Sequence, residues 1–190
     1  MVANMSRDKL IILDRDGVIN HDSDNYIKSA EEWIPIEGSL EAISQLNKLG
    51  YKVAIATNQS GIARGFYDLN TLEIMHNKMQ NLLAMYDGKI DYIAFCPHGP
   101  DDGCLCRKPK PGMLLEIADY FSIQAEETTF IGDTASDIKA AENAKMNFAL
   151  VRTGKGDRTI CEGKTSKHIE IYDSLKGFVD KLSNQGLSIL

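Results

Sequence analysis

The strongest constraint on the fold is the alternation of short apolar runs with amphipathic stretches of helical period. The predicted strands are Leu10–Leu13, Tyr51–Ala56, Ile90–Phe95, Thr129–Ile131 and Asn147–Val151. The predicted helices cover Leu40–Leu49, Leu69–Leu82, Pro111–Phe121, Ser136–Ala144 and Ser174–Leu182. Such alternation predicts an α/β fold with a doubly wound, mostly parallel sheet and helices on both faces. A length of 190 residues predicts one domain, covering residues 1–190.

Polar clusters follow four of the predicted strands directly. They are Asp14-Arg15-Asp16-Gly17, Thr57 to Gly61, the segment from Cys96 to Lys108, and Gly132-Asp133-Thr134. In open α/β sheets, ligands bind outside the carboxyl ends of the strands. A solvated loop would explain any one cluster but not all four, so we expect them to form one site at that edge.

The side chains in these clusters suit magnesium and phosphate. Asp14 and Asp16 would repel each other unless a cation lies between them or one is protonated. With Asp133 they offer hard oxygen ligands, which Mg²⁺ prefers. Thr57 supplies a hydroxyl and Lys108 a positive charge for phosphate oxygens. Taken singly, these residues would be interpreted as an acidic turn, a helix cap and a surface lysine.

Three of the four cysteines lie close together and beside a histidine. Cys96-Pro97-His98 and Cys104-Leu105-Cys106 form two ligand pairs, whereas Cys161 has no partner in sequence and receives no role. Three thiolates and one imidazole suit a closed tetrahedral Zn²⁺ site, which is structural and not catalytic. The alternative is a set of reduced surface thiols. Because Arg107 follows Cys106 directly, zinc would also hold the next residue, Lys108, at the phosphate site.

Composition excludes several classes of partner. The chain has 27 acidic and 21 basic residues and a net charge of -6, which argues against nucleic-acid and anionic-membrane partners. No apolar run approaches the length that spans a bilayer, and the segment from Met1 to Lys9 is polar. We therefore expect a cytoplasmic monomer that acts on a small molecule.

The four clusters together resemble the four motifs of the haloacid dehalogenase phosphatases, from Leu10 to about Val151. The resemblance implies that Asp14 attacks phosphorus and that Asp16 acts as general acid and base. It implies that Thr57 and Lys108 stabilise the phosphoryl oxygens. Mg²⁺ would be bound by Asp14, the main-chain carbonyl of Asp16 and Asp133. Asp137 lies where a second acidic residue of the last motif often occurs.

Within that family, the zinc loop resembles a small group whose members act on a heptose 1,7-bisphosphate or on histidinol phosphate. Segments 57–65, 108–113 and 151–155 look like the heptose enzymes, whereas the short zinc loop is closer in length to the histidinol-phosphate version. The implied reaction is removal of the 7-phosphate of D-glycero-D-manno-heptose 1,7-bisphosphate, a step towards ADP-heptose and the lipopolysaccharide core. The residues that this resemblance assigns to the substrate are Asp22, Asn25, Thr57, Asn58, Gln59, Ser60, Arg107 and Lys108, with Arg64 and Arg152 able to assist.

Three alternatives remain from the sequence alone. The first is hydrolysis of histidinol phosphate at the same site. A nucleic-acid 3′-phosphatase would share the aspartates but lacks support from the acidic charge. An inactive, zinc-stabilised binding module would share the fold, although the intact Asp14, Asp16, Lys108 and Asp133 favour an enzyme. The intervals between the motifs leave no room for a separate lid domain, so we expect an open site.

Overall fold

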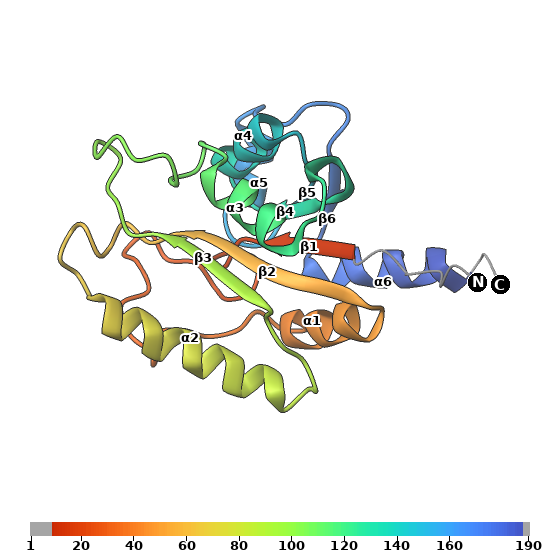
Figure 1. The fold of residues 1–190 in the computed structure, drawn as a ribbon, viewed down its shortest axis with the longest axis horizontal. Coiled ribbons are helices and arrows are strands. Elements are labelled where there is room, and N and C mark those ends of the chain that lie inside the picture. Colours follow the sequence, from red (N-terminus) through yellow and green to blue (C-terminus); the bar gives the residue numbers. More distant parts are fainter. Residues whose placement is uncertain (1–8, 188–190) are drawn as a thin grey trace.

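A computed structural model describes residues 9–187 of the chain. The predicted domain of residues 1–190 extends beyond these residues at both ends. The polar segment from Met1 to Lys9 lies outside the described residues except for Lys9. Within the described range, the structure is a central sheet covered by helices on two sides (Figure 1). No helix in this range is long and apolar enough to cross a membrane.

The sheet has six strands in the order β3-β2-β1-β4-β5-β6, and every pairing between neighbours is parallel. The strands are β1 (Lys9–Leu13), β2 (Tyr51–Asn58), β3 (Tyr92–Cys96), β4 (Thr129–Gly132), β5 (Asn147–Val151) and β6 (Glu170–Tyr172). The predicted doubly wound α/β class is therefore confirmed. Because β1 lies between β2 and β4, the residues that follow these three strands meet at one edge of the sheet.

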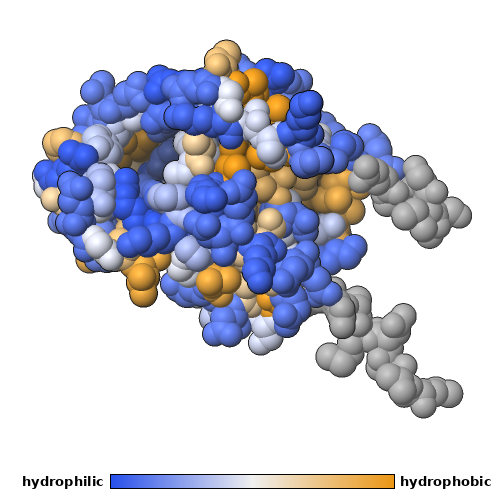
Figure 2. All heavy atoms as spheres, turned by 90° about the horizontal axis from the view of Figure 1, so that it is seen from above, coloured by the Kyte–Doolittle hydropathy of each residue, from blue (hydrophilic) through white to orange (hydrophobic). Residues whose placement is uncertain are grey.

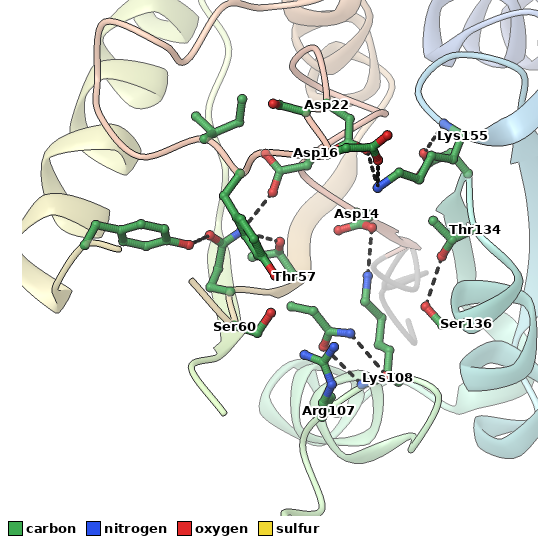
Figure 3. A pocket seen from close by; sticks show the side chains of 18 residues that line it. Asp14, Asp16, Asp22, Thr57, Ser60, Arg107, Lys108, Thr134, Ser136 and Lys155 are labelled. Atoms are coloured by element: carbon green, nitrogen blue, oxygen red, sulfur yellow. Dashed lines mark hydrogen bonds and ion pairs between the residues drawn. The ribbon is translucent and has the colours of Figure 1, made fainter. Parts of the chain in front are cut away.

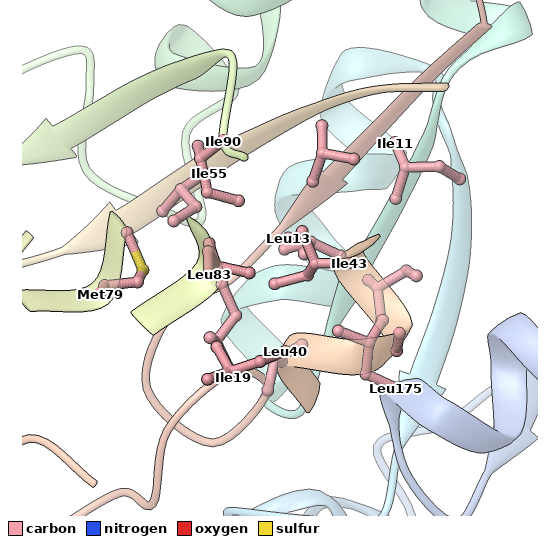
Figure 4. Packing of buried hydrophobic residues seen from close by; sticks show 14 of the residues in the cluster. Ile11, Leu13, Ile19, Leu40, Ile43, Ile55, Met79, Leu83, Ile90 and Leu175 are labelled. Carbon is pink, nitrogen blue, oxygen red and sulfur yellow. The ribbon is translucent and has the colours of Figure 1, made fainter. Parts of the chain in front are cut away.

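Helices cover both faces of the sheet. They are α1 (Ser39–Lys48), α2 (Leu69–Ala84), α3 (Gly112–Phe121), α4 (Ala135–Ala144), α5 (Gly156–Cys161) and α6 (Leu175–Leu187), with a 3₁₀ turn at Ala125–Glu127. Alternate residues of β1 point to opposite faces, as strand geometry requires. Ile11 and Leu13 pack against α1, α2 and α6 (Figure 4), whereas Leu10 and Ile12 pack against α3 and α4.

Local signals account for several helix ends. Helix α2 is capped by Asp68, whose carboxylate accepts a hydrogen bond from the Thr71 N–H at 2.8 Å. Gly50 follows α1 with a φ of 84°, a left-handed conformation that glycine adopts without strain. Thr134 and Asp137 form a capping box at the start of α4, which gives both side chains fixed positions beside the strand ends.

The structure also contains two elements that the sequence patterns did not predict, α5 and β6. Both are short, six and three residues, and β6 shows no buried alternation because it lies at the sheet edge. Other differences are shifts of element ends, such as β2 continuing to Asn58 and α6 to Leu187. No helix or strand lies between Asp16 and Ser39, which agrees with the expected absence of a large cap domain.

Helix α1 allows a test of the core. Ile43 is fully buried between α1 and the sheet, so Ile43→Ala removes apolar contacts and leaves a cavity. We expect the free energy of unfolding to fall by about 2–5 kcal/mol in urea titrations. The matched control is Ile74→Ala on α2, where the side chain is 49% exposed. It should cost less than about 1 kcal/mol, and equal losses in the two variants would contradict this assignment of the core.

Candidate active site

The residues that follow β1, β2 and β4 line one pocket of about 250 Å³ at the carboxyl edge of the sheet. Figure 2 shows this side of the molecule as a largely hydrophilic surface with a hollow in it, and Figure 3 shows the pocket from close by. The sequence-predicted residues in its wall are Asp14, Asp16, Asp22, Thr57, Asn58, Gln59, Ser60, Arg107, Lys108 and Asp133. The expected convergence of the strand-end clusters is therefore present in the structure.

Lys108 is almost completely buried and bridges two carboxylates. Its Nζ lies 2.9 Å from Asp14 Oδ2 and 2.7 Å from Asp137 Oδ1. Burial opposes the ammonium charge, but the carboxylates of Asp137 and Asp14 outweigh it and raise the pKa of Lys108 above its usual value. Lys108 is thus a fixed positive charge at the pocket floor and not the surface lysine of the alternative interpretation.

The side chain of Asn58 holds the backbone of Lys108. Asn58 Nδ2 donates to the Lys108 carbonyl at 3.1 Å, and the Lys108 N–H donates to Asn58 Oδ1 at 3.1 Å. This pair of bonds connects the end of β2 to the loop before α3. Asn58 was assigned to the substrate by resemblance, and the structure shows that its amide is engaged with the protein.

Three carboxylates form a cluster that needs positive charge. One oxygen each of Asp14, Asp133 and Asp137 lie within 4.8 Å of one another. Burial and the charges of Asp137 and Asp16 raise the pKa of Asp14 from 3.8 to about 7, although the Lys108 ammonium lowers it. Burial and the charges of Asp137 and Asp14 likewise raise the pKa of Asp133 well above its usual value. Lys108 supplies one positive charge for three carboxylates, which leaves an excess of negative charge in a buried space.

Asp133 fits a role as magnesium ligand. Its Oδ1 atom is buried and has no hydrogen-bond partner among the described residues, although a buried carboxylate oxygen normally has one. Its Oδ2 accepts from the Lys155 N–H at 2.7 Å. Gly17 and Gly154 crowd the same oxygen so closely that a Cβ at either would lie 2.3 Å from it. The backbone therefore fixes one oxygen of Asp133 and leaves the other available to a hard cation such as Mg²⁺.

Asp16 takes a different direction from the other carboxylates. Its Oδ1 accepts from Arg15 Nη2 at 2.9 Å and from Asn20 Nδ2 at 2.8 Å, and its Oδ2 accepts from Gln59 Nε2 at 2.9 Å. Burial favours the neutral acid, but the Arg15 charge and these donors outweigh it and lower the pKa of Asp16. The carboxylate of Asp16 is not part of the three-carboxylate cluster, so its predicted contribution to magnesium remains that of its main-chain carbonyl.

The four zinc-type ligands meet beyond the end of β3. Cys96 Sγ lies 3.7 Å from Cys104 Sγ and 3.2 Å from Cys106 Sγ, and His98 Nδ1 lies 3.6 Å from Cys96 Sγ and 3.3 Å from Cys106 Sγ. Around zinc, thiolates at about 2.3 Å place neighbouring sulfurs roughly 3.8 Å apart. The cysteines are not disulfide-bonded. The residues present therefore fit a tetrahedral zinc ion.

One wall of the pocket is built from charged residues of two loops. Lys155 Nζ lies 2.9 Å from Asp22 Oδ2 and 3.3 Å from Asp24 Oδ1, so it links the loop after β1 to the segment after β5. Further residues of the pocket wall, to which the sequence analysis gave no chemical role of their own, are Ser23, Asp24, Tyr26, Ile27, Tyr67, Thr134, Ser136 and Lys155. Lys155 lies in segment 151–155, so the resemblance of that segment was the available signal.

Three residues expected near the substrate lie elsewhere. Asn25 is exposed and does not line the pocket, because it lies on the outer side of a turn closed by a Tyr26 N–H to Ser23 carbonyl bond. Arg152 forms ion pairs with Asp157 and Asp173 instead. Arg64 lies over the ring of Tyr26, with its Cζ 5.9 Å from the ring centroid. None of these three side chains lines the pocket, and their roles at the substrate stay predictions.

Comparison with known proteins identifies close relatives over almost the whole chain. A family model described as HAD-hydrolase-like matches residues 105–178. A D-glycero-beta-D-manno-heptose-1,7-bisphosphate 7-phosphatase of Pseudomonas putida is 53% identical over 174 residues, which cover 92% of this chain and 99% of the relative. The enzyme of the same name from Neisseria meningitidis serogroup A is 48% identical over 172 residues, covering 90% of this chain and 92% of the relative.

A solved structure agrees with these relatives. The crystal structure of D,D-heptose 1,7-bisphosphate phosphatase from B. bronchiseptica, complexed with magnesium and phosphate, superposes with a TM-score of 0.91. It is 45% identical and the match covers 93% of this chain and 99% of that one. The match therefore extends over almost the whole chain in both sequence and fold.

The crowded carboxylates predict a pH-dependent stability. Between pH about 4 and about 7, the folded protein without metal retains a proton on Asp14 that the unfolded chain has released, because the pKa of Asp14 is raised from 3.8 to about 7. The Asp14 contribution to the free energy of unfolding should therefore fall as pH rises through this window, by about 1.4 kcal/mol per pH unit. His76 acts in the opposite direction between pH about 4 and 6.5, because its pKa is lowered to about 4 and the folded protein lacks a proton that the unfolded chain binds. The difference in slope between wild type and Asp14→Asn therefore isolates the Asp14 contribution. Urea titrations at several pH values measure this slope.

Two comparisons test the cause of that slope. Saturating Mg²⁺ should stabilise the protein most at the upper end of the window, because the cation binds deprotonated carboxylates. Asp14→Asn should remove the Asp14 contribution to the slope, since the amide does not titrate. Equal pH slopes in metal-free wild-type protein and Asp14→Asn would contradict the assignment.

Proposed function

The chain belongs to the haloacid dehalogenase-like hydrolases, and we propose that it is a Mg²⁺-dependent phosphatase that removes the 7-phosphate of D-glycero-β-D-manno-heptose 1,7-bisphosphate. One observation carries the chemistry: a carboxylate, Asp14, lies between a buried ammonium and a carboxylate with a free oxygen. Relatives of 45–55% identity that extend over most of the chain support the substrate.

The proposed reaction begins with attack of an Asp14 carboxylate oxygen on phosphorus. The new oxygen–phosphorus bond forms as the bond to the sugar oxygen breaks, and Asp16 gives that oxygen its proton. The Lys108 ammonium and the Thr57 hydroxyl stabilise the charge on the phosphoryl oxygens. Mg²⁺ held by Asp14 and Asp133 would shield the anionic nucleophile from the anionic substrate.

Asp16 needs its proton in the first step and must lose it in the second. The donors around Asp16 favour its carboxylate form, which suits removal of a proton from the water that hydrolyses the aspartyl-phosphate. A bound phosphate dianion adds negative charge beside Asp16 and favours the protonated form. The substrate itself therefore helps to prepare the acid for the first step.

The pocket offers cations for the part of the substrate that does not react. Arg107 lines the pocket beside Lys108, and its Nη1 donates to the His98 carbonyl at 3.3 Å. A guanidinium can bind phosphate or sugar oxygens with two parallel hydrogen bonds. A bisphosphate gains from this group, whereas the cationic amine of histidinol phosphate does not, which favours the heptose substrate.

The zinc ligands hold the segment that carries these cations. Arg107 and Lys108 directly follow Cys106, and Lys110 Nζ donates to the Gly103 and Cys104 carbonyls at 3.2 Å and 2.5 Å. We infer that Zn²⁺ bound by Cys96, His98, Cys104 and Cys106 is structural, because all four positions of a tetrahedral ion would be filled by protein atoms. Its contribution to activity is to keep Arg107 and Lys108 in place.

A phosphate-release panel tests the substrate. Heptose 1,7-bisphosphate should exceed histidinol phosphate by at least roughly tenfold in kcat/KM, which is about 1.4 kcal/mol. Asp14→Asn should abolish release from every substrate while the thermal unfolding of the protein remains cooperative, because an amide cannot attack phosphorus. Equal turnover of both substrates would refute the heptose assignment, and an active Asp14→Asn protein free of deamidation would refute the nucleophile.

Metal analysis tests the zinc site. Protein purified without chelators should contain about one Zn²⁺ per chain, and Cys104→Ser should lose it together with part of the stability, because metal binding energy is also folding energy. Cys161→Ser is the matched control, since Cys161 lies outside the cluster and should keep its zinc. A zinc-free wild-type protein, or equal zinc loss in both variants, would contradict the site.

A further inference from the structure

The side chain of Gln59 has no polar atom left for a substrate. It is 2% exposed although it lies in the pocket wall. Its Nε2 donates to Asp16 Oδ2 at 2.9 Å and to Thr57 Oγ1 at 2.9 Å. Its Oε1 accepts from Tyr67 Oη at 2.5 Å and from Arg15 Nη2 at 3.2 Å. An amide offers two N–H donors and two acceptor lone pairs, so all four are in use.

The neighbours of Gln59 fix which way its amide faces. Arg15 can only donate, so it must meet the amide oxygen and not the NH₂ group. Arg15 is itself buried, and the same Nη2 atom also donates to Asp16 Oδ1 at 2.9 Å. The other terminal nitrogen, Nη1, lies 3.4 Å from His76 Nε2. Burial and the Arg15 charge lower the pKa of His76 to about 4, so the imidazole is neutral and can accept from the guanidinium. The reverse orientation of the amide would place donors against donors.

This orientation determines where the Thr57 hydroxyl sends its proton. The Gln59 NH₂ group donates to Thr57 Oγ1, so Thr57 acts as an acceptor on that side. Its own O–H is then free to donate into the pocket, where the phosphoryl oxygens of a substrate would lie. The second N–H of the same amide holds Asp16 Oδ2 (Figure 3). The planar amide of Gln59 thus connects Asp16, the proposed acid, to the Thr57 hydroxyl, the proposed hydrogen-bond donor to the phosphoryl oxygens.

We propose that Gln59 is a positioning residue that orients Asp16 and the Thr57 hydroxyl for the transferring phosphate, and is not a ligand of the sugar. The inference rests on the proposed phosphatase mechanism and deepens it. Asn58, the preceding residue, serves the same purpose for Lys108 through its two bonds to the Lys108 backbone. Consecutive amides at the end of β2 therefore support different parts of the chemistry, and this difference allows a matched test.

The test is Gln59→Leu, which keeps a similar size but can neither donate nor accept. A poorly placed acid matters most when the leaving group is a poor one, such as a sugar alkoxide, and least for 4-nitrophenolate. We expect kcat/KM for heptose bisphosphate to fall at least roughly tenfold more than kcat/KM for 4-nitrophenyl phosphate. This ratio reports on the step in which the leaving group departs, whereas kcat also contains the hydrolysis of the aspartyl-phosphate, which is common to all substrates. Across a series of aryl phosphates, log kcat/KM should depend more steeply on the leaving-group pKa than in wild type.

Asn58→Leu is the matched control. It disturbs Lys108, which stabilises the phosphoryl oxygens of every substrate, so kcat/KM should fall by a similar factor for heptose bisphosphate and 4-nitrophenyl phosphate. Equal losses on both substrates in Gln59→Leu as well would overturn the proposal. A raised heptose KM with unchanged kcat and unchanged leaving-group dependence would also overturn it, because that pattern belongs to a substrate ligand.

Tyr67→Phe keeps the proposal testable if Gln59→Leu does not fold. It removes one donor to Gln59 Oε1 and leaves the Arg15 contact, so the leaving-group dependence should steepen, by less than in Gln59→Leu. An unchanged dependence in Tyr67→Phe would overturn the proposal. Wild-type protein that hydrolyses the aryl series but not heptose bisphosphate would refute the proposed substrate, and the aryl series would still decide the role of Gln59.

Discussion

The buried ion pairs of Lys108 determine how the rest of the site is arranged. A charged ammonium inside a protein is costly unless carboxylates compensate for it, and here Asp14 and Asp137 do so. Asp137 also completes the capping box of α4, so the same carboxylate fixes a helix start and the ammonium group of Lys108. The loop before α3, the end of β1 and the start of α4 are therefore connected through one nitrogen atom.

The contacts of Lys108 also help to explain why the carboxylates of Asp14 and Asp133 stay close together in fixed positions. The Lys155 N–H donates to Asp133 Oδ2, and Gly17 and Gly154 pack against the same oxygen. Asp14 is fixed by its ion pair with Lys108, so neither carboxylate can turn away from the other. The repulsion between them is a fixed property of the fold. A divalent cation bound between them would relieve this repulsion, and the proposed magnesium binding would then stabilise the strand ends.

The sequence was informative where the chemistry depends on residue type and chain order. Strand ends in a parallel sheet lie together, so Asp14, Thr57 and Asp133 could be placed in one pocket from the β/α alternation alone. The cluster of Cys96, His98, Cys104 and Cys106 was predictable for a similar reason, because short spacing limits where these side chains can be. The elements α5 and β6 were missed because both are short and lack a periodic pattern of buried residues.

Side-chain direction could not be predicted in the same way. Asn58 and Gln59 have the residue types of substrate ligands, but their amides are used by Lys108, Asp16 and Thr57, contacts that depend on atoms distant in sequence. Arg152 likewise turns to Asp157 and Asp173, which belong to the unpredicted region after β5.

The ion pairs of Lys155 with Asp22 and Asp24 have a consequence for how substrate preference can change. These contacts lie in loops outside the strands, whereas the amides of Asn58 and Gln59 at the end of β2 are bonded to Lys108, Asp16 and Thr57. Under the proposed mechanism, mutations in segment 22–27 would therefore reshape the pocket wall while the reacting groups keep their positions. In natural divergence and in laboratory redesign, substitutions that change substrate preference would therefore be tolerated best in that segment and least at residues 57–59.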